Sequence, residues 1–328
     1  MRHDDRVHLG RTGVEVTRLG LGLAPLGGLF AAVGDTPAYE TLERAWDLGI
    51  RYFDTAPLYG SGLSERRAGH VLRDKPRAEF ALSTKVGRRL EPSGGDIQQF
   101  WAESTSLAPI WDFSADGTRR SYSESLERMG LESADVLHIH DPDEHYQETL
   151  AGALPALRDL RSAGRVGAVS AGMNQAPMLA DLVRTGDLDC VLLAGRYSLL
   201  DQSGLAELLP LCATRGVSVI VGGVFNSGVL ADPDAGTDRA TFDYGPVPTD
   251  VLARARAIRE VCERHGVPLR AAALRFPFGH PAVSTVLVGA RSADEVFDAV
   301  AMFSVDIPGQ LWRDLGRAGL LPEEVPTP

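Results

Sequence analysis

Short apolar segments alternate with helical patterns along almost the whole chain, and this alternation limits the possible folds more than any other feature. Several of the segments are too apolar for strands with one face in water, which is typical of parallel strands covered by helices. Eight strands are expected, at residues 18–22, 52–54, 81–84, 136–139, 166–170, 190–193, 218–221 and 284–287. Eight strand–helix units predict an α/β fold, the (β/α)8 TIM barrel, as one domain over residues 1–328.

The helices between these strands are marked by signals at their ends. Thr36 and Pro37 are typical of the N-cap and first position of a helix that runs through Leu48 and stops at Gly49. Three further helices are expected to end at or near a glycine: residues 122–129 before Gly130, 148–162 near Gly164, and 249–265 before Gly266.

The two ends of the chain depart from the alternation. The segment VHLGRTGVEVTRLGLG alternates apolar and polar residues on both sides of Arg11-Thr12-Gly13, which is a β-hairpin signal. We expect this N-terminal hairpin to cap the floor of the barrel. Residues from about 315 to 328 end in LLPEEVPTP, and we expect them to form a loose tail.

Two long loops interrupt the alternation, one after the third strand and one after the seventh. They comprise residues 87–117 and 222–248, and both are rich in turn-forming residues. Because both follow strands, we expect them over the face where α/β barrels carry their chemistry. The first loop contains Trp101, Trp111 and Phe113, which favours a functional loop over a disordered one. We therefore expect these three aromatic residues to bind substrate.

Four residues of different chemistry follow the second, third and fourth strands. Asp54 and Tyr59 lie in RYFDTAPLYG, Lys85 in FALSTKVG, and His140 in DVLHIHDPD. A free phenol has a pKa near ~10, which is too high for a base at neutral pH, and a neighbouring ammonium lowers that pKa. We predict that Lys85 acts on Tyr59 in this way and that Asp54 holds Lys85. His140 would bind the reacting oxygen, and the reaction would need a hydride carrier because side chains carry no hydride.

Each of these residues also has a purely structural interpretation. Asp54 is able to cap the turn after its strand, Tyr59 to pack within a loop, and Lys85 to lie in solvent. His138 competes with His140, because the two face the same side of a strand. His140 is nearer the carboxyl end, so we expect it at the mouth and His138 one layer deeper. The shared position after strand ends favours the catalytic interpretation.

The composition argues against several kinds of partner. A net charge of −11 disfavours nucleic acid and anionic membranes, and no apolar run approaches the ~20 residues of a membrane span. The segment MRHDDRVHLG has no apolar signal core, and the three cysteines lack metal-binding spacing. We therefore expect a cytoplasmic protein with reduced thiols, a small-molecule substrate and no metal. Oligomeric state cannot be read from the sequence.

The motifs around the four residues resemble those of the NAD(P)-dependent aldo-keto reductase family. FDTAPLYGSGLSE, STKVG and DVLHIHDPD occur in the family's order and spacing, and the resemblance runs from LGRTGVEVTRLGLG to VLVGARSADEV. It implies an Asp-Tyr-Lys-His tetrad formed by Asp54, Tyr59, Lys85 and His140, with Tyr59 as proton donor or base. The residues alone predict the same roles.

Finer details resemble the branch of this family that acts on free sugars, the L-fucose dehydrogenase or D-threo-aldose 1-dehydrogenase branch. The segments that resemble it are WDFSADGTRRSYSESLERMGL, SAGMNQAPML, LLAGRYSLLDQSG and VIVGGVFNSGVLA. They imply oxidation of the C1 hydroxyl of an aldose such as L-fucose, D-arabinose or L-galactose to a lactone. Pyridoxal oxidation, NADPH-dependent reduction of small aldehydes or ketones, and a cofactor-sensing module without catalysis remain alternatives.

The resemblance also implies a dinucleotide site at the strand ends, where backbone amides approach the pyrophosphate. The residues expected to bind the cofactor are Gly22, Leu23, Asn174, Phe225, Asn226, Ser227, Gly228, Gly289, Arg291 and Glu295. Gly222 stands where the family usually carries the ring that stacks on nicotinamide, so we expect Phe225 or Tyr197 to cover that face. Glu295 stands where NADP users often have arginine, and a carboxylate there repels a 2′-phosphate. We therefore expect NAD in preference to NADP, with NADP kept as the alternative because the Arg291 side chain is able to attract a 2′-phosphate.

Overall fold

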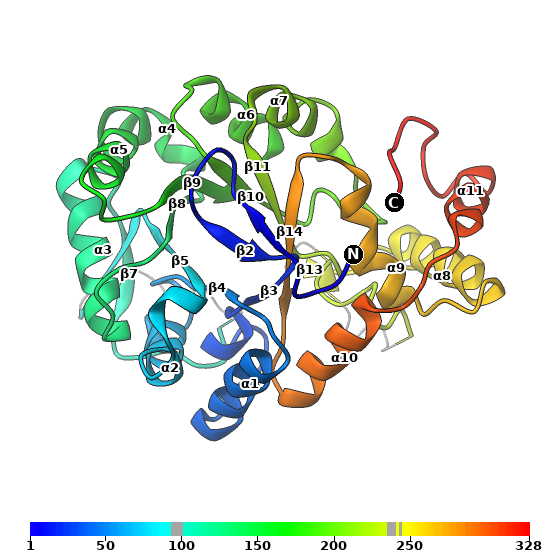
Figure 1. Ribbon diagram of the computed structural model, residues 1–328, viewed down its shortest axis with the longest axis horizontal. Helices are drawn as coiled ribbons and strands as arrows, with labels where there is room; N and C mark the ends of the chain where they lie inside the picture. Colours follow the sequence, from blue (N-terminus) through cyan, green and yellow to red (C-terminus); the bar gives the residue numbers. More distant parts are fainter. Residues whose placement is uncertain (93–100, 235–240, 243–244) are drawn as a thin grey trace.

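Eight parallel strands close into a barrel in the computed structural model, which describes residues 1–92, 101–234, 241–242 and 245–328 (Figure 1). The barrel strands are β3 (Leu19–Gly22), β4 (Tyr52–Asp54), β5 (Ala81–Val86), β8 (Val136–His140), β9 (Ala168–Met173), β10 (Cys190–Ala194), β11 (Ser218–Gly222) and β14 (Val283–Gly289). The predicted TIM barrel is thus confirmed. The fifth strand, β9, begins two residues and ends three residues later than predicted. At its start, Gly167 and Ala168 both donate to the Asp135 carbonyl.

Helices surround the barrel, and α10 contacts α1 to close the ring (Figure 1). They are α1 (Asp35–Asp47), α2 (Leu63–Leu72), α3 (Ala115–Met129), α4 (Tyr146–Glu148), α5 (Leu154–Ser162), α6 (Ala176–Arg184), α7 (Leu208–Arg215), α8 (Thr249–Arg264), α9 (Leu269–Arg275), α10 (Ala293–Phe303) and α11 (Gly309–Arg317). The predicted stop at Gly130 is confirmed, because this residue caps α3 in the left-handed conformation, with a φ of 63°.

Two predicted helix starts were wrong. The N-cap of α1 is Gly34, and Thr36 and Pro37 lie inside the first turn. Proline is tolerated there because the first four N–H groups of a helix have no partner within it. Helix α3 begins seven residues before the predicted position 122, because the Ser114 hydroxyl accepts from the Gly117 N–H at 3.0 Å and caps the helix.

The N-terminal hairpin caps the floor of the barrel, as predicted. It pairs β1 (Arg6–His8) with β2 (Glu15–Thr17) in antiparallel register, and it lies across the centre of the barrel in Figure 1. Its buried residues Leu9, Val14 and Val16 belong to one apolar cluster with the first residues of five barrel strands. Those residues are Tyr52, Ala81, Val136, Ala168 and Cys190.

The two long loops each carry a short antiparallel pair. In the first loop, β6 (Arg88–Glu91) pairs with β7 (Ala108–Trp111). The Ala102 N–H donates to the Gly28 carbonyl, which holds this part of the loop against the segment after β3. In the second, β12 (Thr241–Phe242) pairs with β13 (Gly245–Pro246). Part of each predicted loop lies outside the described residues.

The end of the chain packs against the barrel, which differs from the loose tail that we expected. Helix α11 runs to Arg317 and contacts α8. Leu321 and Val325 are buried, and Arg254 donates to the Leu320 carbonyl at 2.9 Å. The apolar side chains of the tail therefore contribute to the core.

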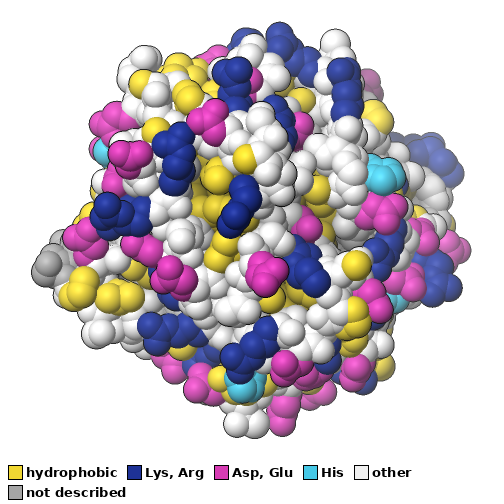
Figure 2. Space-filling view, turned by 60° about the vertical axis from the view of Figure 1, so that its left-hand side comes forward, with side chains coloured by type: hydrophobic (Ala, Val, Ile, Leu, Met, Phe, Trp, Pro, Cys, Tyr) yellow, Lys and Arg dark blue, Asp and Glu magenta, His cyan; other side chains and the backbone are white. Residues whose placement is uncertain are grey.

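The surface mixes charges of both signs. Figure 2 shows one face on which Lys and Arg side chains are interspersed with Asp and Glu side chains. Within the part of the chain that the structure describes, no helix is both long enough and apolar enough to cross a membrane.

We predict that Gly69→Ala destabilises the protein, although alanine favours a helix over glycine by about 1 kcal/mol. Gly69 lies in α2 at its contact with α3, where a Cβ would lie 2.0 Å from the Met129 carbonyl oxygen. Backbone shifts of this kind cost about 1–3 kcal/mol. The free energy of unfolding in urea measures the effect. Gly316→Ala is the matched control, because its Cβ would meet nothing within 4 Å, and equal stabilities for the two variants would contradict the prediction.

Candidate active site

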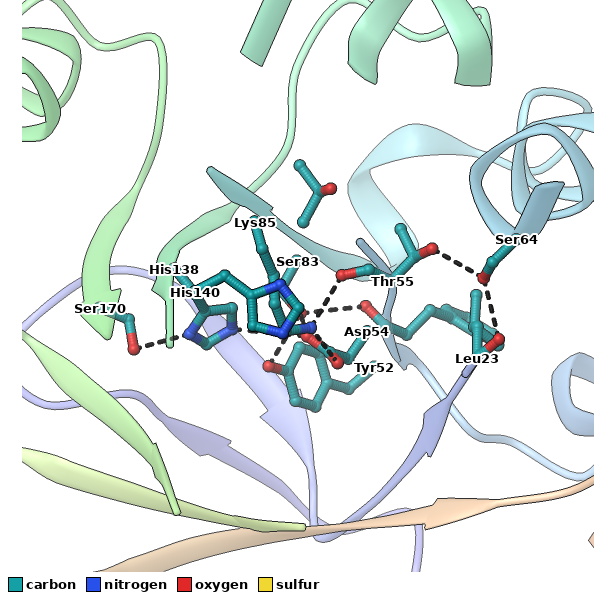
Figure 3. A network of polar contacts seen from close by, with 12 residues as sticks. Leu23, Tyr52, Asp54, Thr55, Ser64, Ser83, Lys85, His138, His140 and Ser170 are labelled. Atoms are coloured by element: carbon teal, nitrogen blue, oxygen red, sulfur yellow. Dashed lines mark hydrogen bonds and ion pairs between the residues drawn. The ribbon is translucent and has the colours of Figure 1, made fainter. Parts of the chain in front are cut away.

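A buried ion pair joins the ends of β4 and β5. Lys85 Nζ donates to Asp54 Oδ2 at 2.6 Å and to the Thr55 carbonyl at 2.8 Å. Both side chains are buried, and the Ser83 hydroxyl donates to Asp54 Oδ1 at 2.6 Å (Figure 3). These three hydrogen bonds hold the two side chains in a fixed arrangement. A buried ion pair needs such bonds to offset the cost of removing its charges from water.

The tyrosine predicted for proton transfer lies directly beside this pair. Tyr59 follows β4 in a turn in which its N–H donates to the Ala56 carbonyl. Lys85 Nζ lies 4.8 Å from the centre of the Tyr59 ring, and the His140 ring meets it edge-on with the two ring centres 5.9 Å apart. The structure therefore brings all four residues of the predicted tetrad together at one end of the barrel.

The two histidines of β8 lie at different depths, as predicted. His138 is completely buried, with Nδ1 2.7 Å from the Ser170 hydroxyl and Nε2 3.5 Å from Asp54 Oδ1 (Figure 3). His140 lies nearer the mouth, with its Nδ1 buried and its Nε2 3.5 Å from Asp141 Oδ2. Burial lowers the pKa of His138 to about 3 and holds the pKa of His140 well below its usual value. Both imidazoles are therefore neutral at physiological pH.

We predict that the buried histidine makes the fold acid-sensitive. Because the folded-state pKa of His138 is about 3 and the usual pKa of a histidine is 6.5, the unfolded state binds the proton more readily between these values. Stability therefore falls as the pH falls through this window, by up to roughly 1.4 kcal/mol per pH unit. His138→Gln is expected to flatten the dependence, measured as the free energy of unfolding in urea from pH 7.5 to 4.5. Equal slopes in the two proteins would contradict it.

The other half of the barrel mouth is lined by strand ends that carry almost no side chain. β3, β11 and β14 end in Gly22, Gly222 and Gly289, and β10 ends in Ala194. At Gly22 and Gly222 neither a positive φ nor packing demands glycine, because a Cβ would meet no atom closer than 3.6 Å. The missing side chains leave room for an extended ligand beside the tetrad, so this half of the mouth fits the predicted dinucleotide.

The residues predicted to bind the cofactor lie at or after the ends of β3, β9, β11 and β14. Leu23 and Asn174 directly follow β3 and β9. Phe225 is half-buried against the core, and Asn226 uses its side chain internally, accepting from Ser198 Oγ at 2.6 Å and donating to the Gly195 carbonyl. Asn226, Ser227 and Gly228 have successive positive φ values of 46°, 57° and 104°, which give the turn after β11 its shape.

An ion pair lies at the beginning of α10. Ser292 caps this helix by accepting from the Glu295 N–H at 3.2 Å. The Glu295 carboxylate accepts from the Arg291 backbone N–H at 2.8 Å and from its guanidinium at 3.2 Å. The positive side chain expected to attract a 2′-phosphate is therefore already engaged by a carboxylate.

The aromatic residues predicted to contact ligands differ in their exposure. Trp101 lies against Tyr59, with ring centres 5.6 Å apart, and Trp111 is 51% exposed. Phe113 is completely buried beside Gly87, where a Cβ would lie 2.3 Å from its ring, so it supports Trp111 instead of facing a substrate. Tyr197 is also buried, packed on Phe276, and therefore does not cover a nicotinamide face.

One pair of charged residues at the mouth was missed in the sequence. Arg88 donates to Asp141 Oδ2 at 2.7 Å, and its guanidinium carbon lies 4.3 Å from the centre of the Trp111 ring. Burial raises the pKa of Asp141. The only local signal was position, since Asp141 directly follows His140 and Arg88 lies three residues after Lys85.

A proton-transfer group beside a glycine-lined cradle defines the class of protein, an NAD(P)-dependent oxidoreductase. The chain belongs to the aldo/keto reductase family, whose sequence profile matches residues 18–317. It is 41% identical to D-threo-aldose 1-dehydrogenase from Pseudomonas sp, over 94% of this chain and 96% of the relative. It is 40% identical to pyridoxal 4-dehydrogenase from Microbacterium luteolum, over 98% and 99%, and 31% identical to L-galactose dehydrogenase from Arabidopsis thaliana, over 89% and 86%.

Solved structures agree with this assignment at the level of the fold. The holo form of aldo-keto reductase AKR11C1 from Bacillus halodurans superposes with a TM-score of 0.78 at 24% identity, covering 98% of each chain. The glycerol dehydrogenase AKR11B4 from Gluconobacter oxydans superposes with a TM-score of 0.74 at 23% identity, covering 100% of this chain and 98% of the other.

Proposed function

We propose that this protein is an NAD-dependent aldose 1-dehydrogenase, in which Tyr59 exchanges the proton of the C1 hydroxyl. The observation that carries the proposal is the position of Lys85 Nζ, 4.8 Å from the centre of the Tyr59 ring. An ammonium at this place favours the phenolate over the phenol. Asp54 and the Thr55 carbonyl fix the ammonium there.

His140 would orient the sugar during this step. Because Nδ1 is buried, Nε2 of the neutral imidazole would be the nitrogen that meets the substrate. An Nε2–H group donates to the C1 oxygen and holds it near the Tyr59 hydroxyl, so that the proton of the C1 hydroxyl passes to the phenolate. Bound beside the glycine-lined half of the mouth, a nicotinamide would supply the acceptor for the hydride that leaves C1, so that the hemiacetal would become a lactone. Trp101, beside Tyr59, offers an aromatic face for the apolar side of the sugar ring.

The contacts of Glu295 support NAD as the cofactor. Its carboxylate binds the Arg291 side chain and backbone at the first turn of α10, so an added phosphate would meet a negative charge at this position. We expect Glu295→Gln to raise kcat/KM for NADP about 10-fold relative to NAD, the effect of about 1.4 kcal/mol. Steady-state kinetics with both cofactors measures this ratio. An unchanged ratio would mean that Glu295 does not set the preference.

The experiment that tests the proposal is a substrate panel followed at the absorbance of the reduced nicotinamide. L-fucose, D-arabinose and L-galactose are each offered with NAD and with NADP. We expect reduction of NAD with at least one aldose and a lower kcat/KM with NADP. If none of these aldoses is oxidised with either cofactor, the proposal is rejected.

Pyridoxal oxidation is a second candidate, favoured by the 40% identity to pyridoxal 4-dehydrogenase over 98% of this chain. Trp101 and Trp111 are able to stack on a pyridine ring as well as on a sugar. Pyridoxal with NAD therefore belongs in the same panel, together with small aldehydes and NADPH. A kcat/KM for pyridoxal well above that for every aldose would make this second candidate the function.

A further inference from the structure

Asp141 occupies a costly backbone conformation next to the reacting centre. Its N–H donates to the Gly172 carbonyl at 3.0 Å, which extends the pairing of β8 with β9 by one residue. The chain then turns with a φ of 43°, a left-handed conformation that aspartate tolerates better than most residues but that a following proline disfavours. Pro142 follows, and proline restricts the preceding residue to extended backbone. Strain of this kind is characteristic of residues placed for function.

The turn directs the carboxylate toward His140. Asp141 Oδ2 lies 3.5 Å from His140 Nε2, the nitrogen proposed above to donate to the substrate oxygen. A negative charge at this distance favours the imidazole tautomer that carries its proton on Nε2. The carboxylate therefore lies beside the place where a substrate oxygen would bind.

Arg88 fixes this carboxylate through one oxygen and leaves the other available. Arg88 donates to Oδ2 at 2.7 Å, and its own side chain is only 7% exposed, between Asp141 and the Trp111 ring. The Asp141 side chain is 32% exposed. Oδ1 makes no hydrogen bond to any residue in the part of the chain that the structure describes. A carboxylate accepts through both oxygens, so Oδ1 is a fixed acceptor at the mouth.

We propose that Asp141 accepts a hydrogen bond from a hydroxyl on the substrate carbon next to the reacting carbon, and that Arg88 holds it for this purpose. The inference rests on the proposed function, because an aldose that reacts at C1 carries such a hydroxyl at C2. Asp141 is then a specificity-determining residue, which selects 2-hydroxylated substrates over their deoxy analogues. The basis of this discrimination is that a bound deoxy substrate would cover the carboxylate and leave it without a donor.

The first test compares two sugars that differ at C2. D-arabinose and 2-deoxy-D-ribose are oxidised with NAD by the wild type and two variants. We expect the wild type to prefer D-arabinose in kcat/KM by about 10- to 100-fold, the range for one charge-assisted hydrogen bond. Asp141→Gly removes the carboxylate, and glycine tolerates the left-handed backbone. The ratio of the two kcat/KM values should therefore fall to about one. Asp141→Asn keeps the shape without the charge and should give an intermediate ratio.

A second pair of substrates separates this inference from the proposed function. 2-Hydroxypropanal and propanal, reduced with NADH or NADPH, differ only in the neighbouring hydroxyl. The ratio of their kcat/KM values should fall in Asp141→Gly as it does for the sugars. If no aldose is oxidised, the aldose proposal fails, and the two aldehydes alone decide the role of Asp141.

The readout is a ratio, so a general loss of rate in a variant does not affect it. Asp143→Asn is the matched control, because it removes a carboxylate two residues away for which the described part of the chain shows no contact with Arg88 or His140. This variant should retain the wild-type ratio. A wild-type ratio near one would overturn the proposal. So would a ratio that survives in both Asp141 variants, even if both substrates react more slowly.

Discussion

Tyr59→Phe is expected to lower kcat by about 10²- to 10⁴-fold, the usual contribution of a general acid or base. The substitution removes only the hydroxyl, so the ring remains between Lys85 and His140, where its contacts lie at 4.8 Å and 5.9 Å. Without the hydroxyl, no side chain in this arrangement is placed to accept the substrate proton while His140 binds its oxygen. Steady-state kinetics with the best substrate of the panel measures the loss.

The cofactor affinity separates a catalytic role of Tyr59 from a structural one. Because the glycine-lined half of the mouth is formed by other strands, the dissociation constant of NAD should change by less than about threefold, or less than ~0.7 kcal/mol. Titration calorimetry measures it in both proteins. Tyr39→Phe is the matched control, since Tyr39 stacks on His70 on the outer helices and should retain full activity. A Tyr59→Phe enzyme with more than a tenth of wild-type turnover would contradict the assigned role.

The barrel and the tetrad were predictable because their signals are local. A strand end is visible in a short apolar segment, and parallel strands of one barrel bring their carboxyl ends to the same rim. Asp54, Lys85 and His140 could therefore be placed together without knowledge of any contact. Strand alternation puts the two histidines of β8 on the same side, and their order in depth followed from His140 being nearer the carboxyl end of the strand.

Features that depend on contacts between distant segments were not predictable in this way. Trp111 and Phe113 are two residues apart, and only the close approach of Gly87 decides that Phe113 is the buried one. The pair of Arg88 and Asp141 depends on the register of β6 against β7, which sets where Arg88 lies on the rim. The C-terminal residues pack because Leu321 meets a surface formed elsewhere in the chain.

The buried ion pair between Asp54 and Lys85 is expected to contribute strongly to the stability of the site. Asp54→Asn leaves the Lys85 ammonium buried without its counter-ion, and breaking a buried pair in this way costs about 3–5 kcal/mol. Both groups are almost completely enclosed, at 4% and 2% side-chain exposure, so water does not replace the lost partner. The free energy of unfolding in urea at pH 7 should fall by this amount, and activity should fall with it because Lys85 loses the group that holds it beside Tyr59.

A double-mutant cycle separates the interaction energy between Asp54 and Lys85 from the cost of burying each charge alone. Lys85→Met leaves the Asp54 carboxylate buried without its counter-ion and is expected to destabilise the fold by a similar amount. The double variant, Asp54→Asn with Lys85→Met, removes both charges and should be more stable than either single variant. Asp159→Asn provides the control, since its pair with Arg119 is exposed at 69% and 45% and its loss should cost less than about 1 kcal/mol. If Asp54→Asn cost no more than Asp159→Asn, the pair would not be holding the site together. Additive effects in the cycle would contradict the coupling between the two charges, and with it the explanation of how Lys85 is kept beside Tyr59.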